Sequence, residues 1–341
     1  MALKKQQFAD GETKIMAQID KILSEILVDP VSRSPLIKLH SQNGKIVEIK
    51  NESGQSYPVI NGVINFANET NYADNFGDQW MRFPKLQLDS FNGTSISAIR
   101  FFKALKLEPN ELKGKLILDV GCGTGRFAEI ALNAGAYVIG LDYSAAAQVA
   151  SKNLEKYSNF RAIRGDIYKL PFKESSFDIV YCLGVLQHTP NVEQAFKSLP
   201  PVVKKPGYLV VDYYWKRLRS VLGWKYPIRL ITSHLKETTV LKILSLIHPF
   251  VYPMSKLVIK TRYVGKALSR LLPVVNYCRD YPELGDELLR EWSFLDTYDN
   301  WAPKYDQPQT VDTVLRWAKE IGLEKVSCEH VGHLVVRGSV K

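Results

Sequence analysis

One stretch, Lys115 to Ser144, restricts the fold of this chain more than any other. It opens with the apolar run LILDV (Leu116 to Val120), the pattern of a strand buried on both faces of a parallel sheet. Small or flexible residues follow at once: Gly121, Gly123, Thr124 and Gly125. Arg126 to Gly135 then repeats apolar residues at helical spacing, and Tyr137 to Asp142 is a second apolar strand ending in an acid. This order predicts a strand–turn–helix–strand unit whose turn lets a ligand approach the backbone closely and whose helix offers unpaired N–H groups.

The turn reads GxGxG and follows an acid, Asp119, whereas a dinucleotide-binding turn reads GxGxxG. The order of acid, turn and second acid resembles motif I of the class I S-adenosylmethionine-dependent methyltransferases. The resemblance implies S-adenosylmethionine as the cofactor. It assigns the methionine end of the cofactor to Asp119 and to the turn residues Gly121, Cys122, Gly123 and Gly125. It also implies that Asp142, with Tyr143 beside it, meets the ribose, as an acid does there in Rossmann folds generally. Cys122 is interpreted as a small packing residue of the turn and not as a nucleophile.

Later segments extend the resemblance over about Lys115 to Trp215. Gly165-Asp166-Ile167 matches the family segment in which an acid meets the adenine amino group and an apolar side chain covers the ring. LPFKESSFDIVYC matches the approach to the fourth strand, and Leu183 directly after it is assigned to the cofactor site. VVKKPGYLVVDYYW matches the turn and fifth strand, with Tyr208 in place of the second glycine. The resemblance is closest to the ubiquinone/menaquinone-type branch, methyltransferase type 11. Taken singly, Asp119 can be a strand-end turn residue and Asp166 a helix cap.

The segment LGVLQHTPN follows the fourth strand, where the family places the methyl group to be transferred. Methyl transfer from a sulfonium mainly needs alignment, and a base helps when the nucleophile is a hydroxyl. His188 is the candidate catalytic base, and Gln187 is a candidate substrate residue. His188 can equally support the loop through a backbone hydrogen bond, and both interpretations stay open.

The front of the chain, Leu27 to Phe66, resembles the small zinc-ribbon domain found ahead of some methyltransferases and in a tRNA-methyltransferase partner subunit. DPVS (Asp29 to Ser32) and ESGQSYPVINGVI (Glu52 to Ile64) keep its frame but lack every cysteine. Zinc sites need thiolate or imidazole ligands, so we predict a degenerate ribbon without metal, its hairpins held by packing alone. The 4 cysteines of the chain lie far apart and form no CxxC pair, which favours a reducing, cytoplasmic location.

The basic residues gather in one segment. Tyr213 to Asp280 carries 13 Lys and Arg against 2 Asp and Glu, a net +11, so the rest of the +10 chain sums to about −1. The same segment holds amphipathic runs too short and too interrupted to cross a bilayer. Two interpretations stay open and can both hold: a helical cap over the active site, and peripheral contact of residues 213–280 with an anionic membrane.

Two other segments carry aromatics and acids. Asn71 to Phe91 places Phe76, Trp80 and Phe83 at roughly helical spacing, as a helix packed on the core or as an aromatic lid over the cofactor. Phe294 to Thr310 is expected to be an extended, proline-held loop, either a plain connector or a substrate-binding element. Its candidate substrate residues are Tyr298, Asp299 and Tyr305.

The expected fold is α/β: a Rossmann-like, seven-stranded, mostly parallel sheet with an antiparallel last strand and helices on both faces. A small N-terminal β segment precedes it, and a helical insertion follows the fifth strand. The expected division is an N-terminal helix and ribbon-like segment (1–70), lid or linker helices (71–110), the cofactor-binding core (111–212), the basic cap (213–300), and a closing helix and hairpin (301–341).

The leading hypothesis is O- or N-methylation of a small-molecule acceptor in a biosynthetic pathway: a sugar, a natural product or a lipid-linked precursor. An RNA methyltransferase is the second hypothesis, prompted by the basic segment. The leucine-rich helices and the lack of an RNA-binding module in the sequence argue against nucleic acid. A non-catalytic cofactor-binding subunit is the third.

Overall fold

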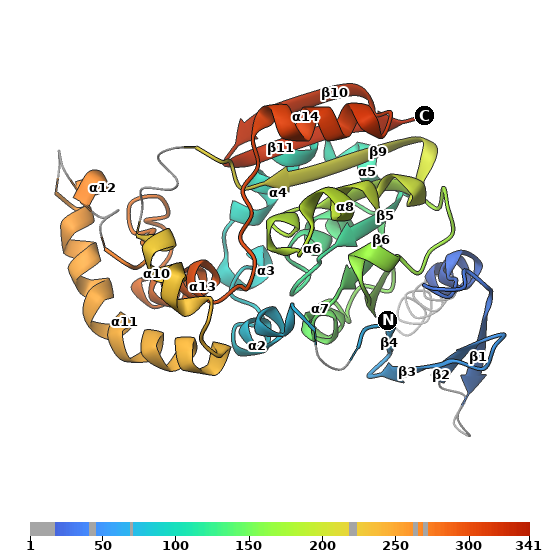
Figure 1. The fold of residues 1–341 in the computed structure, drawn as a ribbon, viewed down its shortest axis with the longest axis horizontal. Coiled ribbons are helices and arrows are strands. Elements are labelled where there is room, and N and C mark those ends of the chain that lie inside the picture. The colour runs from blue at the N-terminus through green and yellow to red at the C-terminus, as the bar shows by residue number, and fades with distance from the viewer. Residues whose placement is uncertain (1–17, 41–45, 69–70, 218–223, 262–264, 269–271) are drawn as a thin grey trace, which may run out of the picture.

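The computed structural model describes residues 18–40, 46–68, 71–217, 224–261, 265–268 and 272–341. The core of the molecule is a sheet of five parallel strands and a closing hairpin (Figure 1). The strands are β5 (Leu116–Val120), β6 (Tyr137–Asp142), β7 (Phe160–Arg164), β8 (Phe177–Cys182), β9 (Val203–Tyr213), β10 (Glu324–Val331) and β11 (His333–Val340). They lie in the order β7-β6-β5-β8-β9-β11-β10, and β11 runs antiparallel to both of its neighbours. This confirms the predicted Rossmann-like class and its antiparallel last strand.

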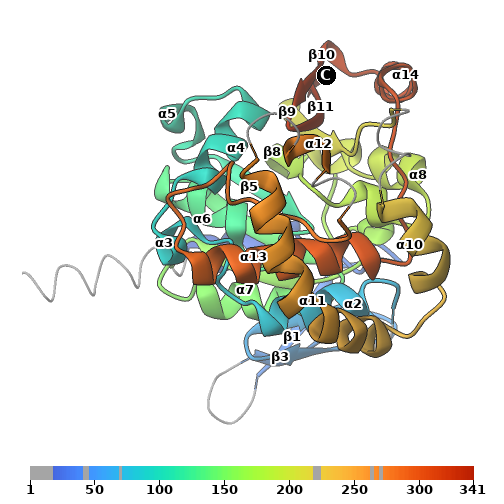
Figure 2. The same cartoon turned by 90° about the vertical axis from the view of Figure 1, so that its left-hand side faces the viewer.

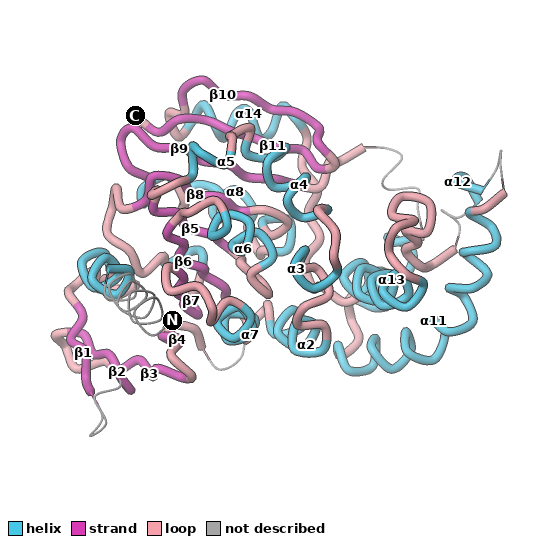
Figure 3. The backbone as a smooth tube through the Cα atoms, turned by 180° about the vertical axis from the view of Figure 1, so that it is seen from behind, coloured by secondary structure: helices cyan, strands magenta, loops and turns pink. Residues whose placement is uncertain are grey.

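Helices cover both faces of this sheet, as Figure 3 shows from behind. On one face, α8 (Val192–Lys197) and α14 (Val311–Glu320) pack Phe196, Val314 and Trp317 against the strands. On the other, α4 (Ile96–Leu105), α6 (Arg126–Asn133) and α7 (Ala146–Asn153) share a second apolar cluster. Successive β5 residues alternate between these two clusters, as the pleat of a strand requires. A short helix, α5 (Pro109–Leu112), leads into β5.

The N-terminal strands enlarge this sheet to eleven strands, which corrects the predicted count of seven. They are β1 (Leu36–His40), β2 (Ile46–Asn51), β3 (Ser56–Ile60) and β4 (Val63–Asn65), and each pairs antiparallel with the next. β4 then pairs in parallel with β7, Ile64 facing Ile163. The β segment is therefore an extension of the core sheet. A helix at residues 18–26 precedes it, and the chain before residue 18 lies outside the described residues.

A buried carboxylate joins the hairpins, so the expectation that packing alone holds them is wrong. Asp29 is fully buried and accepts hydrogen bonds from the Tyr57 hydroxyl (2.6 Å) and the Asn51 side-chain amide (2.9 Å). Its other oxygen accepts the backbone N–H groups of Val31 and Ser32. A buried carboxylate with this many donors is stabilised as the charged form. Asp29 stands at the start of the ribbon-like frame, and its hydrogen bonds join that start to β2 and β3.

The insertion forms a helical layer beyond the end of the sheet (Figure 1). It comprises α10 (Lys225–Thr232), α11 (Glu237–Ile259), α12 (Gly265–Leu268) and α13 (Asp286–Trp301). Figure 2 shows α11 and α13 crossing in front of the sheet, with α2 (Asp74–Arg82) beside them. A short α3 (Asp89–Asn92) follows α2. The described helices include none with the length and apolarity needed to cross a bilayer.

The expectation of an extended loop from Phe294 to Thr310 is wrong over its first half. α13 continues to Trp301, so Tyr298 and Asp299 lie on a helix. The chain becomes irregular only from Ala302, directly before Pro303. A proline disfavours helical geometry in the residue before it, which places the end of α13 here and not eight residues earlier.

Candidate functional site

One cavity of about 300 Å³ lies at the carboxyl ends of the parallel strands. The residue that follows each of these five strands lines it: Gly121, Tyr143, Gly165, Leu183 and Tyr214. In open α/β sheets this edge is where ligands bind. His333 also lines the cavity, because β11 runs antiparallel and therefore begins at the same edge. The volume is at the lower end of the range for small-molecule sites.

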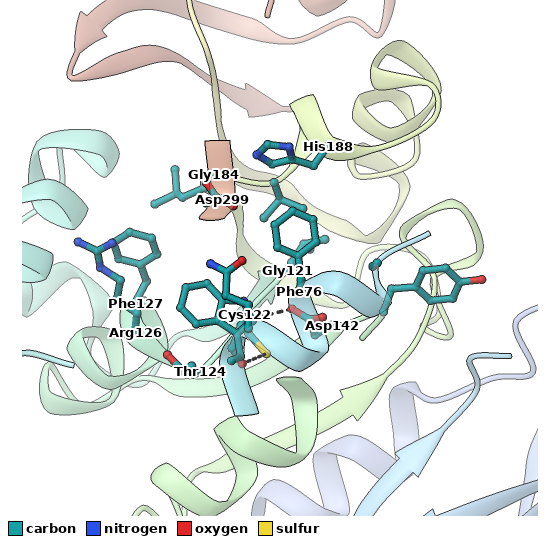
Figure 4. Close-up of a pocket in the computed structure, with 18 of the residues that line it drawn as sticks. Phe76, Gly121, Cys122, Thr124, Arg126, Phe127, Asp142, Gly184, His188 and Asp299 are labelled. Carbon is teal, nitrogen blue, oxygen red and sulfur yellow. Dashed lines mark hydrogen bonds between the residues drawn. The ribbon is translucent and has the colours of Figure 1, made fainter. Parts of the chain in front are cut away.

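The glycine turn forms one wall of the cavity, and Asp142 holds it in place (Figure 4). One Asp142 oxygen accepts the Gly123 N–H at 2.9 Å, and the other accepts the Ser144 N–H and hydroxyl at 2.9 and 2.7 Å. Burial raises the pKa of Asp142, and these hydrogen bonds oppose that shift. A carboxylate offers about four lone-pair positions, so Asp142 retains room for a ligand hydroxyl.

Glycine is required in this turn by backbone geometry as well as by space. Gly121 has φ +76°, and a Cβ there would come within 2.3 Å of Val185. Gly125 has φ +88°, and a Cβ there would meet Leu154 at 2.6 Å. A Cβ at Gly123 would lie 3.4 Å from the Trp80 indole, which also lines the cavity. The protein itself, more than a ligand, therefore demands two of the three glycines.

Two of the predicted cofactor acids do not line the cavity, while Cys122, Tyr143, Ile167 and Leu183 do. Asp119 is buried beneath the turn, and burial raises its pKa to about 7. Asp166 directs its carboxylate to the backbone N–H of Tyr168 at 3.0 Å, which is the capping role that the sequence left open. Of the predicted cofactor residues, Asp142, the turn, Tyr143, Ile167 and Leu183 therefore line the cavity.

His188 lines the cavity from a short 3-10 turn, Leu186–His188, and only 6% of it is exposed. Its Nδ1 lies 3.0 Å from the backbone carbonyl oxygen of Tyr305. A carbonyl can only accept, so this contact requires a proton on Nδ1. Nε2 is buried and makes no hydrogen bond within the described residues. The rings of Phe76 and Tyr214 flank the imidazole, at centroid distances of 5.2 and 5.4 Å.

The side of the cavity opposite the turn is polar. α13 contributes Asp296, Asp299 and Asn300, which are three and four residues apart and so share one helix face. The Tyr214 hydroxyl lies 3.3 Å from Asp299, and the Tyr277 hydroxyl donates to Asp296. Burial raises the pKa of Asp296 to about 6.

Two arginines add to the polar lining, Arg126 directly after the turn and Arg100 on α4. Arg126 donates to Gln87 at 3.1 Å, and burial lowers its pKa to about 10. Arg100 pairs with the buried Asp212 at 2.9 Å. The sequence interpretation omitted these residues, together with Tyr214, Tyr277 and His333. A rule that reads the residue after each predicted strand would have found Tyr214, and the antiparallel last strand would have pointed to His333.

Three candidate substrate residues do not line the cavity. Gln187 is fully buried behind it, and its side-chain amide makes no hydrogen bond within the described residues. Tyr298 points to the opposite side of α13, where it packs with Val240 and Leu244. Tyr305 contributes its carbonyl to His188, and its ring contacts Tyr72 at 6.1 Å.

Aromatic residues of α2 and of the segment before it close the cavity. Tyr72, Phe76 and Trp80 line it, as does Gln79, whose buried Oε1 has no partner in the described part of the chain. Phe76 stands between His188 and the turn in Figure 4. Both interpretations of this segment apply in part, because the helix packs on the core and its aromatics also cover the site.

Comparison with known proteins agrees with this geometry. Residues 118–211 match the family described as "Methyltransferase domain", the type 11 group that the motifs resemble. Residues 118–211 therefore carry a methyltransferase domain, whose cofactor in this group is S-adenosylmethionine. The residues on one side of the cavity fit that cofactor chemically: the turn, Asp142 and the neighbouring apolar side chains.

Two relatives share part of this methyltransferase domain. The sterol 24-C-methyltransferase of Pneumocystis carinii is 35% identical over 113 residues, covering 32% of this chain and 30% of that protein. The ubiquinone biosynthesis O-methyltransferase of Coxiella burnetii is 32% identical over 126 residues, covering 35% and 54%. The chain thus spans between about a third and a half of the length of the curated relatives it matches.

One solved structure similar to the chain is the Haemonchus contortus phosphoethanolamine N-methyltransferase 2. It has a TM-score of 0.44 and 14% identity, covering 76% of this chain and 46% of that one.

Proposed function

We propose that the protein transfers a methyl group from S-adenosylmethionine to a hydroxyl or amine of a small polar acceptor, such as a sugar, a natural product or a lipid-linked precursor. One observation carries the proposal. A single cavity joins the glycine turn and Asp142 to the acids of α13, and His188 also lies in its wall. The two sets of residues therefore face one space, as methyl transfer requires. At about 300 Å³ that space would have to widen to hold cofactor and acceptor at once.

The residues of the turn side would hold the cofactor. Asp142 would accept a ribose hydroxyl, and Ile167 and Leu183 would cover apolar surface. When bound, the cofactor supplies an electrophilic methyl group on a sulfonium centre. The aromatic residues Phe76 and Trp80 would exclude water from the reacting atoms. Asp119 would act from beneath the turn and without direct contact.

His188 would accept the proton of the acceptor nucleophile at Nε2. The Tyr305 carbonyl favours the tautomer with its proton on Nδ1, which leaves a lone pair on Nε2. The backbone contact and the base function are therefore compatible, since they use different nitrogens of the ring. Tyr214 and Phe76 restrict the orientation of the imidazole.

The polar side of the cavity would bind the acceptor. Asp296 and Asp299 can accept from hydroxyl or ammonium groups, while Arg126 is a donor. The names of the two relatives, which refer to sterols and to ubiquinone biosynthesis, also favour a small-molecule acceptor. The enclosure of the site by α2 and α13 favours a small molecule over RNA, whose sequence-specific recognition splays bases across open surfaces.

The test is incubation of purified protein with methyl-labelled S-adenosylmethionine and fractionated metabolites, in parallel with total RNA. The proposal predicts label in a small-molecule fraction. It also predicts that His188→Gln gives no label in that fraction although this variant still binds the cofactor. Label in RNA alone would support the second hypothesis. Cofactor binding without transfer to any fraction would favour a non-catalytic subunit.

A further inference from the structure

The outward face of α11 carries a stripe of exposed apolar side chains. Ile243, Leu246, Phe250, Met254 and Leu257 are 38%, 71%, 72%, 56% and 72% exposed. Their spacings of three and four residues place them along one side of the helix. In the part of the chain that the structure describes, no other element buries these five side chains. We call these five residues the α11 stripe.

The inward face of α11 is a normal core face. Val240, Leu244, Tyr252 and Ile259 are buried, and the helix packs on α13. His248 contacts Ser293 of α13 at 3.0 Å. α11 is therefore apolar on two opposite sides, only one of which the described chain covers. A contiguous exposed apolar surface of this kind marks a binding surface in a folded protein.

The position of the α11 stripe makes it accessible to a broad surface. α11 forms the outer end of the cap and bows along its length, away from the N-terminal strands (Figures 1 and 3). Pro249 and Pro253 lie inside it, and proline is the usual cause of a bend in a helix. A straight helix of 23 residues would be about 35 Å long. Because α11 bends, a plane can meet the stripe along part of this length.

Basic residues accompany the α11 stripe. At 100° per residue, Lys242, Lys256 and Lys260 fall together on one flank of it. Lys256 also contacts Asp286 at the start of α13. The segment from Tyr213 to Asp280 carries +11, while the rest of the chain is near −1. An apolar stripe with lysines along its edge is the pattern of a helix that lies in a membrane interface, and the charge complements anionic lipid.

We propose that the α11 stripe docks on an anionic lipid bilayer, with its apolar side chains in the boundary between headgroups and acyl chains and the flanking lysines at the headgroups. The proposal does not depend on the reaction. It would place α13, and with it the polar side of the cavity, about one helix diameter from the lipid.

Vesicle flotation of the full chain tests the proposal, with phosphatidylcholine alone or with about 30% phosphatidylglycerol. We expect binding to the anionic vesicles that weakens as salt rises. Met254→Asp and Phe250→Asp should each reduce it by at least about tenfold, because a carboxylate would enter the apolar boundary and face anionic lipid. Lys242→Gln should reduce it by about fivefold and flatten the salt dependence.

Ile37→Asp is the matched control. Ile37 is 54% exposed, close to the 56% of Met254, and lies on β1 away from the cap. This variant should bind vesicles like the unmodified protein, and S-adenosylmethionine binding checks that all variants are folded. Recovery of the unmodified protein in the unbound fraction with both vesicle types would overturn the proposal, as would equal binding by Phe250→Asp. A dimer in light scattering that Phe250→Asp dissociates, without vesicle binding, would instead assign the stripe to a second copy.

Discussion

The two sides of the cavity are built in different ways. The proposed cofactor side consists of turns that directly follow buried parallel strands, so its residues come from short stretches whose sequence already determines their local structure. The proposed acceptor side combines α13 with Tyr277 and Arg100 of α4, which only tertiary packing brings together, and with Arg126, which directly follows the turn. The first side suits a ligand common to a family, and the second can change with the inserted helices while the sheet stays the same.

The largest expected effect is on the rate of methyl transfer. His188→Gln should lower the rate of methyl transfer by about 10²–10⁴-fold, because it removes the proton acceptor at Nε2. The affinity for S-adenosylmethionine should stay unchanged, as calorimetry can measure. An unchanged rate would reduce His188 to a support of the loop through the Tyr305 carbonyl.

The next effect tests the buried charge of the acceptor side. Burial raises the pKa of Asp296 from 3.8 to about 6, so the folded protein holds this proton more tightly than the unfolded chain does. Its stabilising contribution is full below about pH 4 and is lost as the pH rises through about 6. Asp296→Asn should therefore raise the free energy of unfolding by about 3 kcal/mol at about pH 8 and by little below about pH 4. Urea unfolding at both pH values measures it, with the exposed Asp312→Asn as control. The same gain at both pH values would contradict the shift.

On the cofactor side, Asp142→Ala should weaken S-adenosylmethionine binding by about 1–3 kcal/mol, since a ligand hydroxyl and the Gly123 N–H both lose their acceptor. Asp166→Ala should have a smaller effect, because that carboxylate is directed to the Tyr168 N–H and not to the cavity. Calorimetry on both variants compares them. Equal losses would mean that the bound state brings Asp166 into the site.

The smallest effect concerns the acceptor. Asp299→Asn should raise the KM for the acceptor about tenfold, the loss of one hydrogen bond to a charged group, and leave cofactor affinity unchanged. Its neighbour Tyr298 faces Val240 and Leu244, so Tyr298→Phe should leave that KM unchanged. Steady-state kinetics with the identified acceptor measures both. A KM change in Tyr298→Phe alone would reverse the assignment of faces on α13.

The cofactor side was largely predictable and the acceptor side was not. The apolar runs predicted the first and last residues of β5 and β6 correctly, because buried parallel strands are short, continuous apolar segments. Side-chain direction did not follow from the motif: Asp119 lies under the turn, and Asp166 caps a backbone N–H. Because α13 is a helix and not a loop, Asp296, Asp299 and Asn300 lie on its cavity side, while Tyr298 lies on the opposite side. Arg100 could not be placed, since its approach to the cavity depends on the packing of α4 against the sheet, whereas Arg126 directly follows the predicted turn.

The parallel pairing of β4 with β7 has a consequence for the synthesis of the chain. Ile64 pairs with Ile163, so the N-terminal strands leave the ribosome long before the strand on which they dock. Until then their own hairpins and the Asp29 carboxylate must hold them together. Once β7 is in place, β4 covers it and moves the open edge of the sheet outward to β1. The N-terminal strands thereby protect β7, whose unpaired edge would otherwise offer a template for aggregation with a second chain.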